Sequence, residues 1–422
     1  MRVIISIGHG RLHLLSSAYW IAKAGVSVCL LCGWVPKKPN GLLVRIASRL
    51  VGRDLSAGFR KRVLAQPNYD VCSCAYAEIV DQILRLFCRA FGISTHCVSS
   101  LGWSLWGFQS RFFLKKADVF HCRSGAGQGG AIKKAKRLGM KVLVDHSALH
   151  PAKSEQNLKD DYARWGQEIA IAPNKGVWKN VLKDCRDADV IMVNANHIRD
   201  SFVEFGFPFE KLRVVYLGVR EDFQSLKGNY HADGTFKVLF TGAFTLLKGA
   251  EYMLQSLQIL VARGVPVHYD IVGSVDIPQE LRDKYEDFPI TYHGAVPQDE
   301  LKAFLSDADI YLFPSLADGC AQSGMEALAA GLPVVATYQS GLPIVDGETG
   351  CVVPMKDAQA IADKIAWLRQ NQEVREMLGR NAAEMMRENY TWEKYAENVK
   401  RLYEELAGTA GGLFRPVSDV LG

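Results

Sequence analysis

Two acidic residues, Asp318 and Glu326, lie eight positions apart and are the strongest candidates for a ligand-binding site in this sequence. They belong to a segment, residues 313–337, that is typical of a strand, an irregular loop, a short helix, a glycine stop and a second strand. The loop would follow the carboxyl end of a strand, where open α/β sheets bind ligands, and its amide groups would precede a helix N-terminus, which attracts anions. Ser323 and Glu326 also match a capping box, so the alternative is that Glu326 closes its own helix.

Residues at other strand ends are weaker candidates for ligand binding. Lys248 lies between a predicted strand and a predicted helix, where a cation could meet a bound phosphate, although a lone loop lysine is usually solvated. His146 follows the strand predicted over 141–145 and is a candidate for ligand binding there. His150 is the alternative candidate at the same strand end. Near the N-terminus, Gly8-His9-Gly10 predicts a tight turn that lets the backbone approach a ligand.

The elements that would position these residues form a repeating pattern. Short apolar segments alternate with helical patterns along the whole chain, which predicts βα units whose strands are buried on both faces. The predicted strands are 2–7, 26–32, 118–122, 141–145, 189–194 and 213–217, followed by 236–241, 267–273, 290–293, 309–313, 333–337 and 351–353. A chain of 422 residues favours two domains, and a polar, glycine-containing segment after residue 218 is the predicted linker.

Composition excludes several classes of protein. With 48% hydrophobic and 23% charged residues, the chain is not expected to be disordered, collagen-like or a disulfide scaffold. Its ten cysteines favour a reducing compartment, and Cys29 and Cys32 lie in a predicted strand, where residues three apart point to opposite faces. No cluster of ligand residues has metal-binding spacing, so no metal is expected. No segment has the length of a signal peptide or a membrane span, so a cytoplasmic location is expected.

The segment 313–337 resembles the E-x7-E signature of glycosyltransferase family 4, whose members are retaining nucleotide-sugar transferases of the GT-B fold. Other segments resemble the same family in the expected order: Val238 to Gly242, Lys248-Gly249, Ile271 to Gly273, His293-Gly294, Ala308 to Ile310, Pro314-Ser315, Gly331 to Val335, Asp346 to Gly350 and Tyr390 to Trp392. The resemblance covers most of residues 189–406. It is looser over the first 188 residues, where it rests on the opening strand with its glycine turn and on Val142 to His146.

This resemblance implies an α/β protein of the GT-B fold, in which two Rossmann-like domains with parallel sheets face each other across a cleft. The expected parts are an acceptor-side domain over 1–218, a linker over 219–234, a nucleotide-sugar donor domain over 235–390, a helix over 391–407 that crosses back, and a flexible tail over 408–422. The implied activity is transfer of a sugar from a nucleotide-diphosphate sugar to a saccharide acceptor with retention of anomeric configuration. No metal or other cofactor is expected to take part.

The resemblance also implies roles for single residues. Glu326 is expected to bind the hydroxyls of the nucleotide ribose, and Lys248 to neutralise the leaving diphosphate. His146 is expected near the anomeric centre, and catalytic roles are implied for His146, Lys248 and Asp318. The donor sugar's hydroxyls are expected at four loop residues, Asp318, Gly319, Cys320 and Ala321, and the glycine turn is expected to contribute Gly8, Gly10 and Arg11 to substrate binding.

The sequence departs from the family pattern at three positions. Asp318 is usually Glu, Ala321 is usually Gly, and Ala243 stands where the family has an arginine five residues before the lysine. The first two changes suggest an unusual donor sugar, and the third removes half of a cationic clamp, for which Arg11 is the candidate replacement. The alternative function is therefore a degenerate GT-B protein that acts as a nucleotide- or glycan-binding scaffold subunit. A GT-B epimerase or phosphorylase is a further rival, whereas the missing G-x-G-x-x-G disfavours a dinucleotide oxidoreductase.

Charge is spread unevenly, since residues 1–230 carry a net +16 and the remainder −11. Arg45, Arg49 and Arg53 fall four apart on one face of a predicted basic amphipathic helix. A second basic and aromatic segment contains Trp103, Trp106, Phe108, Arg111, Phe112, Phe113, Lys115 and Lys116. Both are either ordinary helices packed on the first domain or contacts with an anionic membrane surface.

In the second case the protein would lie on the inner face of the membrane and meet a lipid-linked saccharide acceptor of cell-surface polysaccharide or glycolipid synthesis. No nucleic-acid motif accompanies the charge, so no nucleic-acid partner is expected.

Overall fold

The computed structural model describes residues 1–9, 13–35, 41–51, 54, 56, 69–92, 96–169, 171, 175–232 and 234–408. The N-terminal part contains a seven-stranded parallel sheet in the order β3-β2-β1-β4-β5-β6-β7. Its strands are β1 Arg2–Ser6, β2 Ser27–Cys32, β3 Asp70–Ser73, β4 Val119–Arg123, β5 Lys141–His146, β6 Val190–Val193 and β7 Leu212–Val214.

The C-terminal part contains a six-stranded parallel sheet in the order β12-β10-β8-β13-β14-β15. Its strands are β8 Phe236–Thr241, β10 Val267–Val272, β12 Ile290–Gly294, β13 Ile310–Phe313, β14 Val334–Thr337 and β15 Cys351–Val353, and two short strands, β9 Phe244–Thr245 and β11 Val275–Asp276, pair beside it. The α/β prediction and every strand predicted from an apolar segment are confirmed. The edge strand β3 was missed because it is short, polar and only partly buried.

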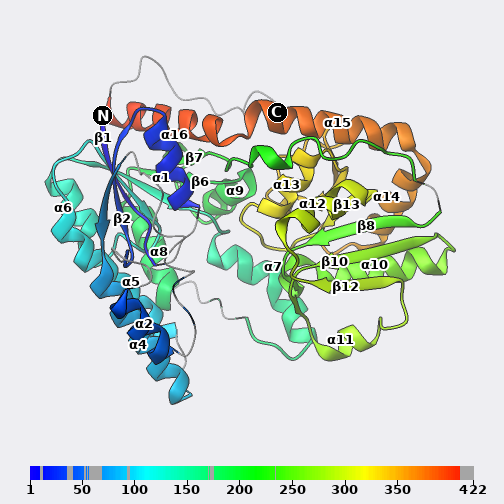
Figure 1. The fold of residues 1–422 in the computed structure, drawn as a ribbon, viewed down its shortest axis with the longest axis horizontal. Coiled ribbons are helices and arrows are strands. Elements are labelled where there is room, and N and C mark those ends of the chain that lie inside the picture. The colour runs from blue at the N-terminus through cyan, green and yellow to red at the C-terminus, as the bar shows by residue number, and fades with distance from the viewer. Residues whose placement is uncertain are drawn as a thin grey trace.

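Helices connect the strands as in βα units (Figure 1). In the N-terminal part they are α1 Leu14–Lys23, α2 Leu42–Val51, α4 Ala75–Ala90, α5 His96–Ser110, α6 Ala131–Arg137, α7 Pro151–Arg164, α8 Gly176–Asp187 and α9 Asn196–Glu204. In the C-terminal part they are α10 Ala250–Ala262, α11 Gln279–Asp283, α12 Gln298–Asp307, α13 Gln322–Ala330, α14 Ala358–Gln370, α15 Gln372–Asn389 and α16 Trp392–Ala407.

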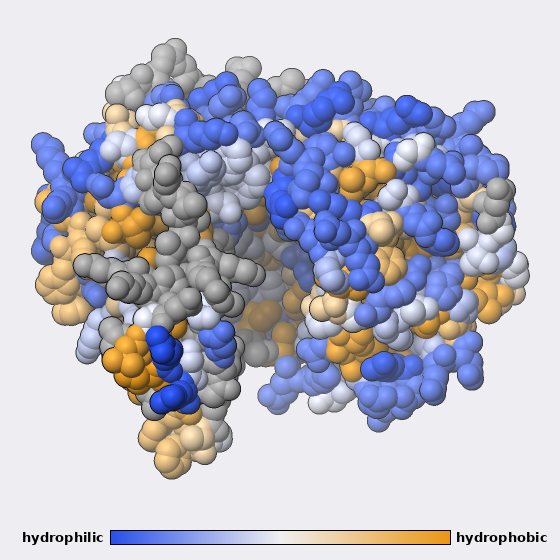
Figure 2. All heavy atoms as spheres, in the orientation of Figure 1, coloured by the Kyte–Doolittle hydropathy of each residue, from blue (hydrophilic) through white to orange (hydrophobic). Residues whose placement is uncertain are grey.

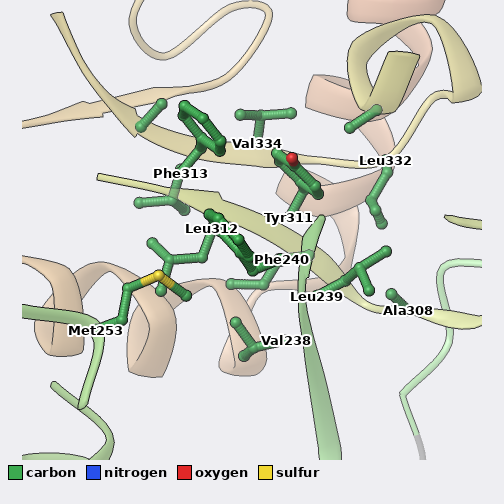
Figure 3. Close-up of a cluster of buried hydrophobic side chains, with 14 of the residues drawn as sticks. Val238, Leu239, Phe240, Met253, Ala308, Tyr311, Leu312, Phe313, Leu332 and Val334 are labelled. Atoms are coloured by element: carbon green, nitrogen blue, oxygen red, sulfur yellow. The ribbon is translucent and has the colours of Figure 1, made fainter. Parts of the chain in front are cut away.

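The core of the C-terminal sheet is aromatic on its central strands. Phe240 of β8 and Phe313 of β13 stack with ring centroids 5.5 Å apart, and Tyr311 stacks on Phe313 at 6.1 Å. Figure 3 shows these rings with Met253 of α10 and the aliphatic side chains around them. This packing holds the carboxyl ends of β8 and β13 next to each other, and those ends carry the two loops of the candidate site.

Two helices connect the two halves of the molecule. α16 runs back over the N-terminal sheet, as Figure 1 shows, and buries Tyr395, Val399, Leu402 and Tyr403 in the same cluster as residues of β1, β2 and α1. In the opposite direction, α7 follows β5 of the first sheet but packs Leu158 into the core of the second. Asn157 of α7 donates a hydrogen bond to the carbonyl oxygen of Leu316, 2.8 Å away.

A buried polar network lies beneath the carboxyl end of β5. The Asp145 carboxylate lies 3.0 Å from His13 Nε2 and 3.6 Å from His121 Nε2, and the other ring nitrogen of His121 lies 2.6 Å from the Tyr403 hydroxyl of α16. Burial alone would raise the pKa of Asp145, but the charges and hydrogen bonds of the two histidines hold it well below its usual range. The network therefore ties the crossing helix to the strand that carries His146.

Candidate functional site

The candidate site lies where loops from the carboxyl ends of the two sheets touch. Figure 2 shows a hollow between the two halves of the molecule. The loop after β13 reaches the segment after β5, because a Cβ built on Gly319 would lie only 2.2 Å from the carbonyl oxygen of Ser147. A second contact joins the same loop to α9, since His197 Nε2–H donates to the carbonyl oxygen of Asp318 over 2.8 Å.

The loop after β13 brings together two of the residues that the sequence predicts. The Lys248 ammonium forms an ion pair with one carboxylate oxygen of Asp318, and the other oxygen accepts a hydrogen bond from the Gly319 amide over 2.7 Å. Gly249 makes this approach possible, because its φ is +79° and a Cβ there would lie 2.1 Å from the carbonyl oxygen of Pro314. Both charged side chains keep some exposure, 23% for Lys248 and 16% for Asp318.

Glu326 lies in α13 and does not cap its own helix. The residue at the N-cap position is Ala321, with no side-chain cap, and Ser323 instead donates to the carbonyl oxygen of Thr241 over 3.0 Å. Within the described part of the chain, no hydrogen bond or ion pair to the Glu326 carboxylate is found. Burial raises the pKa of Glu326 to about 7, although the charge of Arg220 lowers it. The capping interpretation is therefore wrong, and the carboxylate is left to bind something else.

His146 is a neutral, almost fully buried imidazole at the end of β5. Its Nδ1 lies 2.8 Å from the Ser124 hydroxyl, while its Nε2 is buried without a hydrogen-bond partner among the described residues. Burial lowers the pKa of His146 to about 4, and the nearby charge of Arg123 lowers it further. His150 has a structural task instead, because its Nδ1 accepts a hydrogen bond from Ala152 N–H at the start of α7. Of the two histidines, His146 has the nitrogen without a partner.

The other predicted residues are placed as follows. Gly8 has φ +70°, and a Cβ there would lie 2.3 Å from the Trp103 ring, so only glycine fits this turn. Gly10 and Arg11 lie outside the described residues. The amide of Ala321 donates to the carbonyl oxygen of Ser340 over 3.2 Å. Cys320 lies in the same loop, and burial raises the pKa of its thiol far above the usual range.

Sequence reasoning missed two residues beside this site, His197 and Arg123. His197 lies at the start of α9 and contacts a loop 121 residues further along the chain. Arg123 is the last residue of β4, and its charge acts on His146. The only local signal was that both come directly after, or at the end of, a buried strand.

Two further expectations concern metals and membranes. In the ranges that the structure describes, no group of three or more His, Cys, Asp or Glu side chains could hold a metal ion. Among the described helices, none is long and apolar enough to cross a membrane.

Comparison with known proteins gives a sequence match over part of the chain. Residues 235–371 match the family model "Glycosyl transferases group 1". The amylovoran biosynthesis glycosyltransferase AmsK of Erwinia amylovora is 28% identical over 274 residues, which is 61% of this chain and 62% of AmsK. The chain spans about half the length of the curated relatives that it matches.

Solved structures show the fold of the whole chain. Sucrose-phosphate synthase of Thermosynechococcus elongatus superimposes with a TM-score of 0.63 at 17% identity, covering 97% of this chain and 100% of that one. Anabaena HepE, solved in complex with UDP, superimposes with a TM-score of 0.60 at 12% identity, covering 96% and 100%.

Two parallel sheets with touching carboxyl-end loops, together with the solved structures, show the GT-B fold. Over residues 235–371 the chain is similar to group 1 glycosyltransferases.

We expect Gly319→Ala to push the two halves apart. The added methyl group would overlap the Ser147 carbonyl oxygen, and such overpacking typically costs about 1–3 kcal/mol. Hydrogen–deuterium exchange of residues 146–150 and 318–321 should therefore become faster. Gly228→Ala is the matched control, because a Cβ there meets no atom within 4 Å. Unchanged exchange in folded Gly319→Ala would mean that the contact does not persist in solution.

We also expect Glu326→Gln to stabilise the protein at pH 8 but hardly at pH 5. The pKa of Glu326 is raised above its unfolded value, so the native state binds more protons between about pH 4.5 and 7 and loses stability as pH rises through that window. A neutral amide removes this cost, roughly 1–3 kcal/mol at pH 8 after allowance for partial exposure. Urea unfolding at both pH values measures it, with the exposed Glu348→Gln as control. An equal effect at both pH values would contradict the raised pKa.

Proposed function

We propose that the protein is a retaining glycosyltransferase that moves a sugar from a nucleotide-diphosphate sugar to a saccharide acceptor in cell-surface polysaccharide or glycolipid synthesis. The observation that carries the proposal is the ion pair between Lys248 and Asp318, in a loop that touches the segment next to His146 across the two halves. The named activity of AmsK and the UDP bound in HepE support the substrate class.

In the proposed reaction, the acceptor hydroxyl attacks the anomeric carbon on the face from which the diphosphate leaves. The bond from that carbon to the phosphate oxygen breaks, a bond to the acceptor oxygen forms, and the acceptor proton passes to the departing phosphate. The protein then needs no separate base, and its task is to position the reactants and to stabilise charge on the leaving group.

The chain's own residues would divide this work. Lys248 would exchange part of its ion pair with Asp318 for the charge that develops on the diphosphate. Asp318 would accept hydrogen bonds from hydroxyls of the donor sugar, and Glu326 from the ribose hydroxyls. His146, neutral because burial lowers its pKa to about 4, would offer a hydrogen bond to the sugar without adding charge. No metal-dependent step is part of this proposal.

The proposed acceptor is lipid-linked, and the N-terminal part offers a surface suited to a membrane. One face of α4 exposes Tyr76, Ile79, Ile83 and Phe87 at helical intervals, and Phe91, which is 67% exposed, continues this spacing directly after the helix. Figure 2 shows apolar side chains at the protruding end of this half. Arg45 and Arg49 of α2 are exposed, whereas Arg53 lies outside the described residues.

The second basic and aromatic segment is only partly a surface feature. Trp106 is buried in the core and donates a hydrogen bond to the Ser6 hydroxyl over 2.9 Å, so at this residue the segment packs on the first domain. Trp103 is half-buried against the same core, and Phe108 and Phe112 are exposed. An exposed apolar face near basic residues is typical of proteins that bind anionic membranes.

Kinetics of two variants test the proposed roles. We expect Glu326→Gln to weaken donor affinity and Lys248→Ala to lower the turnover rate constant, each about 10- to 100-fold, because each removes one charged hydrogen bond. Donor titrations with single-turnover rates separate the two effects. Lys237→Ala is the control, since Lys237 lies at the opposite end of β8. Equal donor affinity in wild type and folded Glu326→Gln would refute its role at the ribose.

Vesicle sedimentation tests the membrane proposal. The wild-type protein should bind vesicles that contain anionic lipid and should not bind neutral vesicles. High salt should release it, because binding depends on basic surface residues that each contribute about 1 kcal/mol to the binding free energy. The double variant Arg45→Gln/Arg49→Gln should bind roughly tenfold more weakly. The control is Arg380→Gln/Arg387→Gln, on exposed arginines of α15. Equal binding to both vesicle types would indicate a soluble acceptor.

A further inference from the structure

Arg123 occupies the point of the N-terminal sheet where ligands of parallel α/β proteins usually bind. It is the last residue of β4, which lies between β1 and β5 in the sheet. The chain order of the strands reverses between β1 and β4, and a crevice forms at the carboxyl ends of strands at such a switch point. The register pairs Arg123 with Asp145 of β5, and Asp145 directly precedes His146. On the side of β1, Arg123 lies just beyond the end of the strand, which leads to Gly8.

The Arg123 guanidinium has no counter-ion in the part of the chain that the structure describes. No ion pair within 4 Å and no hydrogen bond of its side chain is found there, and Nη1 is buried without a partner. Asp145 is the carboxylate opposite in register, but His13 and His121 already hold it at 3.0 and 3.6 Å. A guanidinium with a buried, unpartnered nitrogen is costly, and proteins keep such groups mainly where a ligand supplies the missing partner.

Burial lowers the pKa of Arg123, while the charge of Asp145 acts in the opposite direction. Arginine remains protonated at any physiological pH even so, because its unperturbed pKa is above about 12. Arg123 therefore cannot avoid the cost of burial by losing its proton.

The surroundings of Arg123 fit a saccharide better than a simple ion. The Trp103 ring centroid lies 6.0 Å from the guanidinium carbon, and the ring is half-buried, so one part of it stays accessible. Gly8 and Gly125 lie against the same ring, with built Cβ positions 2.3 and 3.5 Å from it. An aromatic surface beside glycine turns, with a few polar groups, is typical of small-molecule sites.

The loop that follows Arg123 is held rigidly in place. The buried Asp184 carboxylate accepts hydrogen bonds from the amides of Gly125 and Gly127 over 2.7 and 2.8 Å, and one from the Gln128 side chain. These bonds fix the backbone immediately after Arg123 and Ser124, and Ser124 in turn contacts His146. The guanidinium is thus presented from a pre-organised wall, which reduces the entropy lost on binding.

We propose that Arg123 binds a carboxylate or phosphate group of an anionic saccharide acceptor, with the Trp103 ring beside the sugar. This inference rests on the proposed transferase function and specifies the chemical class of its acceptor. The planar guanidinium can donate two parallel hydrogen bonds to either anion, a geometry that a lysine cannot offer. The position of Arg123 on the N-terminal sheet, next to His146, assigns it to the acceptor rather than to the donor diphosphate near Lys248.

The first experiment compares charged and neutral probes on the wild-type protein by calorimetry. Glucuronate is paired with glucuronamide, its neutral analogue of similar shape, and glucose 1-phosphate with glucose. We expect at least one charged probe to bind about 10- to 100-fold tighter than its neutral partner, as the loss of a charged hydrogen bond predicts. The pair with the larger ratio identifies carboxylate or phosphate. Equal affinity within both pairs would overturn the proposal.

The second experiment assigns the preference to Arg123. In R123Q the charged probe should bind no more tightly than its neutral partner, while the affinity for UDP stays within about twofold of wild type. K141Q is the matched control, because Lys141 is exposed at the opposite end of β5. A folded R123Q that keeps the ratio would overturn the proposal, as would one that loses UDP affinity as strongly as it loses the probe.

If R123Q does not fold, R123K keeps the buried charge and removes only the planar fork. It should weaken binding of the preferred charged probe several-fold, and an unchanged affinity would overturn the proposal. The probes bind without a nucleotide sugar, so this outcome is separate from that of the transferase assay. A chain that turns over only neutral acceptors would retain the proposed function and lose this inference.

Discussion

The site depends on one steric constraint, the contact between the backbone at Gly319 and the carbonyl oxygen of Ser147. A Cβ at Gly319 would lie 2.2 Å from that oxygen, so the two halves can approach this closely only with glycine at this position. Gly341 is constrained in the same way, because a Cβ built on it would lie 2.1 Å from the carbonyl oxygen of Gly319. This contact requires the two halves of the molecule to keep a fixed position relative to each other. α16 does this over the first sheet and α7 over the second, where the buried Asp161 of α7 pairs with Lys356.

Four charged groups of the two halves separate into two sets by their partners. Asp145 and Asp184 are buried carboxylates with full sets of partners, two histidines in one case and two backbone amides with a glutamine in the other. Such satisfied groups fix the loops around them. Glu326 and Arg123 are charged groups of opposite sign without such partners, one on each half of the molecule. A protein tolerates that cost where a ligand completes the interaction, which is why we propose Glu326 for the donor side and Arg123 for the acceptor side.

Most of the fold could be predicted from the sequence, because most of its strands are buried on both faces and are therefore continuous apolar segments. β3 escaped detection because Asp70–Ser73 is a polar edge strand that no such segment marks. The candidate residues Lys248, Asp318 and Glu326 were predicted from a motif, and His146 from a looser resemblance. His197 and Arg123 make contacts between distant parts of the chain, which local patterns do not contain. At two positions the sequence left alternatives open: Ser323 bonds to the end of β8 rather than to its own helix, and Trp106 is buried in the core.

The carboxylate of Asp318, where the family that the sequence resembles has a longer acid, is held by two contacts. One oxygen of Asp318 accepts a hydrogen bond from the next amide, that of Gly319, over 2.7 Å, a bond that suits the short side chain. The other oxygen faces Lys248. The carboxylate is therefore drawn toward the backbone, about one methylene group closer than a glutamate would place it. A donor hydroxyl that meets this acid must come correspondingly closer to the loop, and the buried Ala321 on the same loop leaves less space than glycine would. In the proposed roles, both changes would act on the donor sugar and neither touches Glu326, whereas Ala243, the third departure from the family pattern, would reduce the positive charge available to the leaving diphosphate.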